Sequence, residues 1–177
     1  MKMVFKYGAG AAVLAVAGAL AGCGGHGTTA TGDSSGDQFV AYTGNFASFL
    51  TWNHYQDTLV DGSGNLPTGV AGSRDQYLNT LPPHGSTEFP VGTIIVEVRE
   101  DGKIFAAAKR GGDFNADGCV NWEFFELAEN PVAITWRGLG PPAGDTYGGD
   151  PNGCNDCHSQ CKSNDYVCSP KLQLSSF

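Results

Sequence analysis

Residues 92–109 read GTIIVEVREDGKIFAAAK, and this stretch indicates the type of fold. Two runs of apolar and β-branched residues, 92–98 and 103–109, flank the tripeptide Glu100-Asp101-Gly102. Asp-Gly between two strand-forming runs is typical of the tight turn in a β-hairpin. We therefore expect two adjacent antiparallel strands.

Two further runs, 121–127 and 132–136, continue this pattern after short loops and predict a meander of three or four antiparallel strands. Between Phe39 and Leu59, apolar residues recur at spacings of three and four, which predicts one or two short helices with Asn45 as a candidate N-cap. The segments 61–85 and 138–153 are rich in Gly and Pro and are expected to be mainly loop. The predicted class is α+β, with a mainly antiparallel sheet.

The first 22 residues have the pattern of a secretory signal. A charged start with Lys2 and Lys6 is followed by an apolar run, 9–20, that is too short and too rich in glycine for a membrane span. The sequence Leu-Ala-Gly-Cys at 20–23 resembles the lipobox of bacterial lipoproteins, in which the cysteine is acylated. We expect a signal peptide at 1–22, a lipid on Cys23 and a flexible tether up to residue 37.

This leader predicts an exported, periplasm-facing lipoprotein, anchored to a membrane (most simply the outer membrane) through Cys23, with a domain at 38–177. Removing Lys2 and Lys6 from a formal net charge of −8 makes the mature charge −10. An acidic chain does not suit nucleic acid, whose phosphates require a basic face. Export also places the later cysteines where disulfides persist.

The sequence Cys154-Asn155-Asp156-Cys157-His158 is C-x-x-C-H, the attachment sequence of c-type haem. This spacing places two thiols and an adjacent imidazole on one short helix, where they can hold one covalent haem with His158 on the iron. Two other interpretations remain. The cysteines could form only disulfides, giving a haem-free stapled lipoprotein, or could contribute to a zinc site.

The sixth iron ligand is constrained by composition, because both methionines lie in the predicted signal peptide. Methionine–histidine ligation is therefore excluded for the mature chain. The other histidines are His26, His54 and His84. We expect an open iron site, and the alternative is a bis-histidine electron carrier that uses His54 or His84.

Several short pieces occur in an order that resembles the cytochrome P-460 family, which includes the β-type cytochromes c-prime. The resemblance covers about residues 46–167 and rests on PHG at 83–85, FPVGTIIV at 89–96, AKR at 108–110, NWEFF at 121–125, CNDCH at 154–158 and NDYV at 164–167. It implies a mostly antiparallel β fold, usually a homodimer, with one c-type haem and His158 as proximal ligand. It also implies binding of nitric oxide or oxidation of hydroxylamine, with an unknown redox partner.

The resemblance also shows a departure at Glu97. Hydroxylamine-oxidising members carry a lysine bonded to the haem at this place, so that cross-link is not expected here. Strand alternation places Glu97 on the face of Thr93, Ile95 and Arg99. Glu97 either lies on a solvated face, near Lys109, or lines the distal pocket and accepts protons from a bound substrate.

Three phenylalanines, Phe105, Phe124 and Phe125, lie on strands expected beside that of Glu97 and are the aromatics predicted to contact the haem. Ordinary core packing is their alternative role. The tryptophans Trp122 and Trp136 are assigned to packing.

Residues 113–121 begin like a calcium loop of the D-x-N-x-D-G type. The twelfth position is Phe124, where a bidentate carboxylate is needed, so a polar hairpin loop is expected instead. Three cysteines, Cys119, Cys161 and Cys168, remain beyond the haem sequence. A Cys161–Cys168 bridge would close a small loop, but Cys119 could pair with either.

Overall fold

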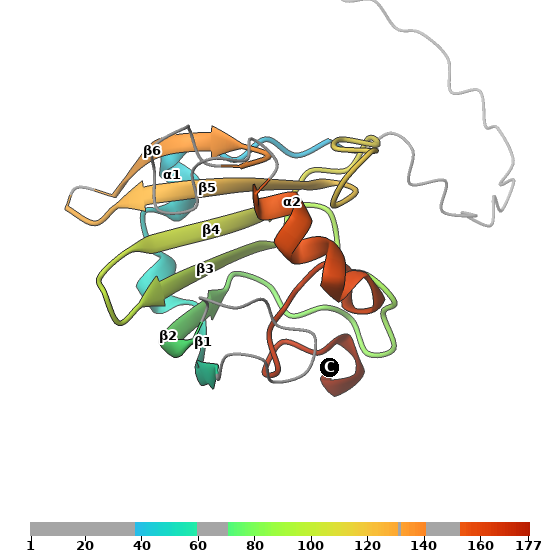
Figure 1. Ribbon diagram of the computed structural model, residues 1–177, viewed down its shortest axis with the longest axis horizontal. Coiled ribbons are helices and arrows are strands. Elements are labelled where there is room, and N and C mark those ends of the chain that lie inside the picture. The colour runs from blue at the N-terminus through green and yellow to red at the C-terminus, as the bar shows by residue number, and fades with distance from the viewer. Residues whose placement is uncertain (1–37, 60–70, 131, 141–152) are drawn as a thin grey trace, which may run out of the picture. The chain divides into compact units, whose positions relative to one another are not determined.

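The computed structural model describes residues 38–59, 71–130, 132–140 and 153–177. Six antiparallel strands form one sheet in chain order (Figure 1). The strands are β1 (Asn53–Leu59), β2 (Gly72–Leu78), β3 (Ile94–Arg99), β4 (Ile104–Lys109), β5 (Trp122–Ala128) and β6 (Ala133–Gly138). The predicted mainly antiparallel α+β class is confirmed, and the meander is longer than the three or four strands expected.

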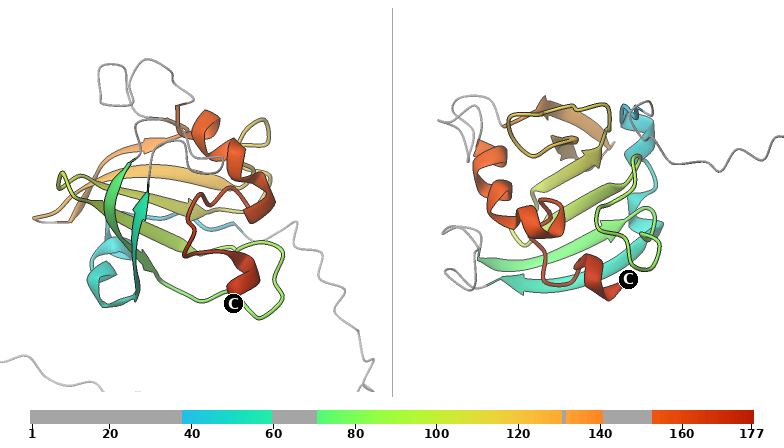
Figure 2. Two further views of the ribbon diagram at one scale, coloured as in Figure 1. Left: turned by 60° about the horizontal axis from the view of Figure 1, so that its bottom comes forward. Right: turned by 90° about the vertical axis from the view of Figure 1, so that its right-hand side faces the viewer.

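The helices are all short. They are α1 (Thr43–Phe46) and α2 (Gly153–His158), with the 3-10 helices η1 (Phe49–Thr51), η2 (Ser159–Asn164) and η3 (Leu174–Ser176). Helix α2 and the segment after it lie across one face of the sheet, while α1 lies on the opposite face (Figures 1 and 2).

The predicted hairpin is confirmed as β3 and β4, with Val98 opposite Ile104. The Arg99 N–H donates to the Lys103 carbonyl at 2.9 Å. Gly102 has a φ of +80°, a left-handed conformation that glycine adopts without steric cost. The Asp-Gly pair therefore fixes the turn as the sequence indicates.

The helical interpretation of residues 39–59 is only partly right. Helix α1 and η1 account for 43–51, but 53–59 is the strand β1, so His54 lies on a strand. Asn45 is not the N-cap: it is inside α1, and its Oδ1 accepts the Tyr42 N–H at 2.8 Å. Strand β1 escaped detection because it is an edge strand whose only buried residues are Asp57 and Leu59.

The interpretation of residues 61–85 as mainly loop is wrong at 72–78, which form β2. The buried positions of this strand include Arg74 and Gln76. Because polar side chains occupy positions that face inward, the strand has no apolar alternation to detect.

Each face of the sheet buries its own core. Ile94, Val96 and Phe125 pack with α1 and η1 on one face. Leu78, Phe124 and residues of the C-terminal segment pack on the other. This follows from strand alternation, since successive side chains point to opposite faces.

The predicted signal peptide, the acylated Cys23 and the tether lie outside the described residues. Among the described residues, no helix is long and apolar enough to cross a membrane.

Candidate functional site

Helix α2 and the sheet face beneath it enclose a cavity that brings most of the predicted site residues together. Cys154, Cys157 and His158 line it from the helix, and Glu97, Phe105 and Phe124 line it from the strands. The polar residues Arg74, Gln76 and Arg99 complete this wall. The sheet thus supplies the floor of the cavity, and α2 with residues 166–169 supplies its roof.

The two thiols of the C-x-x-C-H sequence are chemically available. Cys154 and Cys157 form no disulfide in the structure, and both are half-buried. Residues three apart on a helix share one face, which is why both reach the same cavity. Burial raises the pKa of Cys154 to about 12 and also raises the pKa of Cys157, so both are neutral thiols near pH 7.

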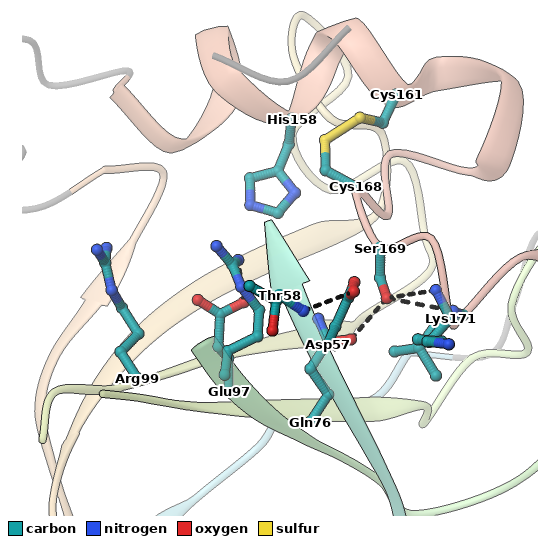
Figure 3. A network of polar contacts seen from close by, with 12 residues as sticks. Asp57, Thr58, Gln76, Glu97, Arg99, His158, Cys161, Cys168, Ser169 and Lys171 are labelled. Carbon is teal, nitrogen blue, oxygen red and sulfur yellow. Dashed lines mark hydrogen bonds and ion pairs between the residues drawn. A yellow bond between two sulfur atoms is a disulfide. The ribbon is translucent and has the colours of Figure 1, made fainter. Parts of the chain in front are cut away.

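His158 is held in a defined orientation above the sheet (Figure 3). Its Nδ1 lies 2.8 Å from the carbonyl oxygen of Tyr166, and its ring centroid lies 4.8 Å from that of Phe124. A carbonyl can only accept, so Nδ1 carries the proton and Nε2 keeps its lone pair. Burial lowers the pKa of His158, which favours the neutral imidazole that binds metals.

Glu97 lies on β3 and faces this cavity, as strand alternation predicts. Its Oε2 is 2.7 Å from Nη1 of Arg74 on β2, and their side chains are 21% and 9% exposed. The solvated alternative beside Lys109 is wrong: Glu97 lies opposite Phe105 across the hairpin, and Lys109 binds elsewhere. Arg74 was missed because β2 was interpreted as loop.

Two of the three predicted phenylalanines, Phe105 and Phe124, line the same space. The ring of Phe125 packs instead in the core on the opposite face of the sheet, with its centroid 5.2 Å from that of Phe46. Its alternative role in core packing is therefore the one that the structure shows. Trp122 and Trp136, which the sequence assigned to packing, line the cavity as well.

The other histidines lie away from the cavity wherever the structure describes them. Nε2 of His54 is 2.7 Å from Oδ1 of Asp75, and the ring of His54 stacks on Tyr77, which packs against the core of the opposite face. Nδ1 of His84 is 2.7 Å from the carbonyl oxygen of Phe177. His26 lies outside the described residues.

The loop whose sequence resembles a calcium site contacts α2 through hydrogen bonds. Nδ2 of Asn115 donates to Oδ1 of Asn155 at 2.7 Å, and Nδ2 of Asn155 donates back to Asn115 at 3.0 Å. In the described part of the chain, no group of three or more His, Cys, Asp or Glu side chains is placed to hold a metal ion. The loop 113–121 is therefore a docking element for the helix that carries the thiols.

The remaining cysteines are resolved by the tertiary structure. Cys161 and Cys168 form a disulfide. Cys119 is fully buried, with its Sγ 3.5 Å from the carbonyl oxygen of Asn155. Burial raises the pKa of Cys119 to about 12, so the leftover thiol is shielded from oxidation both by packing and by its protonated state.

The sequence matches no known protein-family model and no curated protein.

Proposed function

We propose that this chain is an exported, lipid-anchored c-type cytochrome of the P-460 type. It holds one covalent haem and binds or redox-converts small nitrogen species such as nitric oxide or hydroxylamine. The observation that carries this proposal is the convergence of two free thiols and one oriented imidazole on a single cavity beneath α2.

The residues present fit a covalent haem. Cys154 and Cys157 supply thiols for two thioether bonds, and Nε2 of His158 is the available axial donor because Nδ1 is occupied by Tyr166. When bound, the haem supplies an iron centre that coordinates a small ligand and exchanges electrons. Phe105, Phe124 and the other aromatic walls of the cavity exclude water from the macrocycle.

Glu97 is the proposed proton acceptor. Arg74 holds Oε2 at 2.7 Å, which fixes the carboxylate in the cavity and compensates its charge. A carboxylate in this position can take protons released when a nitrogenous substrate is oxidised. Since the residue is not lysine, the proposal includes no cross-link to the macrocycle.

The proposed location is the periplasm-facing side of a membrane, most simply the outer membrane, with attachment through lipid on Cys23. A separate redox protein would exchange electrons with the haem. A homodimer follows from the family resemblance alone. The acidic chain is not proposed to bind nucleic acid.

A bis-histidine electron carrier is less well supported. His54 stacks on a residue that packs against the opposite face of the sheet, and His84 is engaged by the C-terminal residue. Both would have to leave these partners to reach the cavity. Alanine substitution of either is expected to leave the absorption spectrum unchanged.

The test is an absorption spectrum of the chain coexpressed with cytochrome c maturation proteins, oxidised and reduced, before and after addition of nitric oxide. A covalent high-spin haem that shifts with ligand supports the proposal and justifies a hydroxylamine assay. A low-spin spectrum indifferent to ligand would favour electron transfer. A colourless chain would leave the haem-free, disulfide-stapled lipoprotein.

Two variants sharpen this test. The double variant Cys154→Ala/Cys157→Ala should carry no covalent haem, that is, no haem that stays attached when the chain is denatured. Cys119→Ala is the matched cysteine control, because that thiol lies outside the cavity lining, and it should retain the pigment.

A further inference from the structure

The carbonyl that orients His158 comes from an unusual stretch of backbone. Asp165 and Tyr166 have φ values of +50° and +65°. Two consecutive non-glycine residues in the left-handed region are sterically unfavourable, and such conformations persist only where the surroundings hold them. The contacts around this dipeptide therefore decide where the Tyr166 carbonyl points.

The first of these contacts is a buried ion pair. Nζ of Lys109, on β4, lies 2.6 and 2.8 Å from the two carboxylate oxygens of Asp165. Their side chains are 3% and 7% exposed. The Phe89 N–H also donates to Asp165 Oδ2 at 2.8 Å. Asp165 is thus fixed to the rigid hairpin of the sheet.

The second contact is the disulfide between Cys161 and Cys168 (Figure 3). In the sequence this bridge encloses Tyr166. Within it, the Tyr166 N–H donates to the Cys161 carbonyl at 2.9 Å. Just beyond it, Oγ of Ser169 donates to Oε1 of Gln76 on β2 at 2.6 Å. The loop is therefore fastened to the sheet at two places, through β4 and through β2.

We infer that the buried Lys109–Asp165 pair is a positioning device for the axial imidazole. It fixes the Tyr166 carbonyl against Nδ1 of His158, and so sets the direction and the donor strength of Nε2. The physical basis is that a hydrogen bond accepted from the far nitrogen of a ligating histidine orients the ring and raises its basicity. This inference rests on the proposed haem function, in which Nε2 binds the iron.

The test compares the wild type with Lys109→Met/Asp165→Asn, which removes both charges and nearly preserves volume. The readouts are covalent haem content, the iron–histidine stretching frequency of the ferrous protein by resonance Raman spectroscopy, and the midpoint potential. We expect unchanged haem content, a lower stretching frequency and a higher potential, because a weaker donor stabilises ferric iron less.

The matched control is Glu88→Gln. The side chain of Glu88 is 65% exposed, and its Oε2 lies 3.6 Å from Lys109 Nζ. Glu88→Gln therefore removes a charge next to the same lysine and leaves the Lys109–Asp165 pair intact. The stretching frequency and the midpoint potential should both stay at the wild-type values. A double variant with full haem content and an unchanged stretching frequency and potential would overturn the inference.

Should the double variant fail to fold, Asp165→Asn alone tests the same pair, because it removes the carboxylate charge that Lys109 contacts and keeps the size of the side chain. It should change the stretching frequency and the midpoint potential in the same direction, and no change in either would overturn the inference. If the wild-type chain carries no haem, the proposed function fails. The orientation of His158 is then measured by ¹⁵N NMR, which distinguishes the two tautomers of the ring. A wild-type ring protonated only at Nδ1, and a mixture of tautomers in the variants, would support the inference. The same tautomer in the wild type and the variants would contradict it.

Discussion

Nη1 of Arg74 lies 2.7 Å from Oε2 of Glu97, and this pair crosses from β2 to β3 on the floor of the cavity that His158 lines. The two residues are partly desolvated, so each depends on the other for charge compensation. The arrangement places one fixed carboxylate in the lining of the cavity.

Replacing Glu97 by Gln tests its proposed role. The substitution keeps size and removes the proton acceptor, so ligand binding should persist while any hydroxylamine-dependent turnover falls by about 10²-fold. Stopped-flow binding and steady-state rates between pH 5 and 8 measure the two effects separately. Glu100→Gln, at an exposed position just after the same strand, is the control. Identical binding and turnover across this pH range would remove the proton-acceptor role.

Asn155 is expected to dock α2 onto the sheet. Its Oδ1 accepts from Asn115 Nδ2 and from the Cys119 N–H at 3.1 Å, and the residue is 7% exposed. Asn155→Ala removes the acceptor of the buried Cys119 N–H, while Asn115 Nδ2 keeps the carbonyls of Cys119 and Trp122. The substitution should therefore lower the free energy of unfolding by about 1–3 kcal/mol. Urea unfolding measures this loss, and Gln160→Ala, at an exposed position nearby, should change little. Equal losses in the two variants would count against a docking role.

The buried thiol of Cys119 should make the fold sensitive to alkali. Burial raises its pKa from the usual 9.0 to about 12, so the folded state favours the neutral thiol. Its contribution is complete below pH 9 and is lost as the pH rises toward 12, because the unfolded thiol ionises first. The free energy of unfolding should fall more steeply than in Cys119→Ala, by about 1.4 kcal/mol per pH unit. Urea denaturation of the wild type and Cys119→Ala at pH 8–11 measures this difference. An equal pH dependence of the free energy of unfolding in the two proteins would contradict the prediction.

The Cys161–Cys168 disulfide should contribute to stability through the unfolded chain. The two cysteines are separated by seven positions. Restricting a loop of this length removes conformational entropy from the unfolded state worth about 2–3 kcal/mol. Cys161→Ser/Cys168→Ser should therefore lower the free energy of unfolding by that amount, as measured by urea denaturation. An unchanged midpoint and slope would show that the loop is already restricted without the bridge.

Local sequence patterns determined the parts of this protein that depend on neighbours along the chain. Asp101-Gly102 specified the turn between β3 and β4, and alternation placed Glu97 on the face that lines the cavity. The spacing of Cys154, Cys157 and His158 brought three reactive groups to one helix. In each case the determining interaction lies within a few residues, so the pattern is visible without the fold.

Only the tertiary structure decided which polar residues meet. Arg74 and Glu97 are 23 positions apart, and Lys109 and Asp165 are 56 apart. Strand β2 was missed because its inward residues are polar and are buried through partners on other strands. Such pairs leave no periodic signal, since their desolvation is compensated by contacts that exist only after the chain has folded.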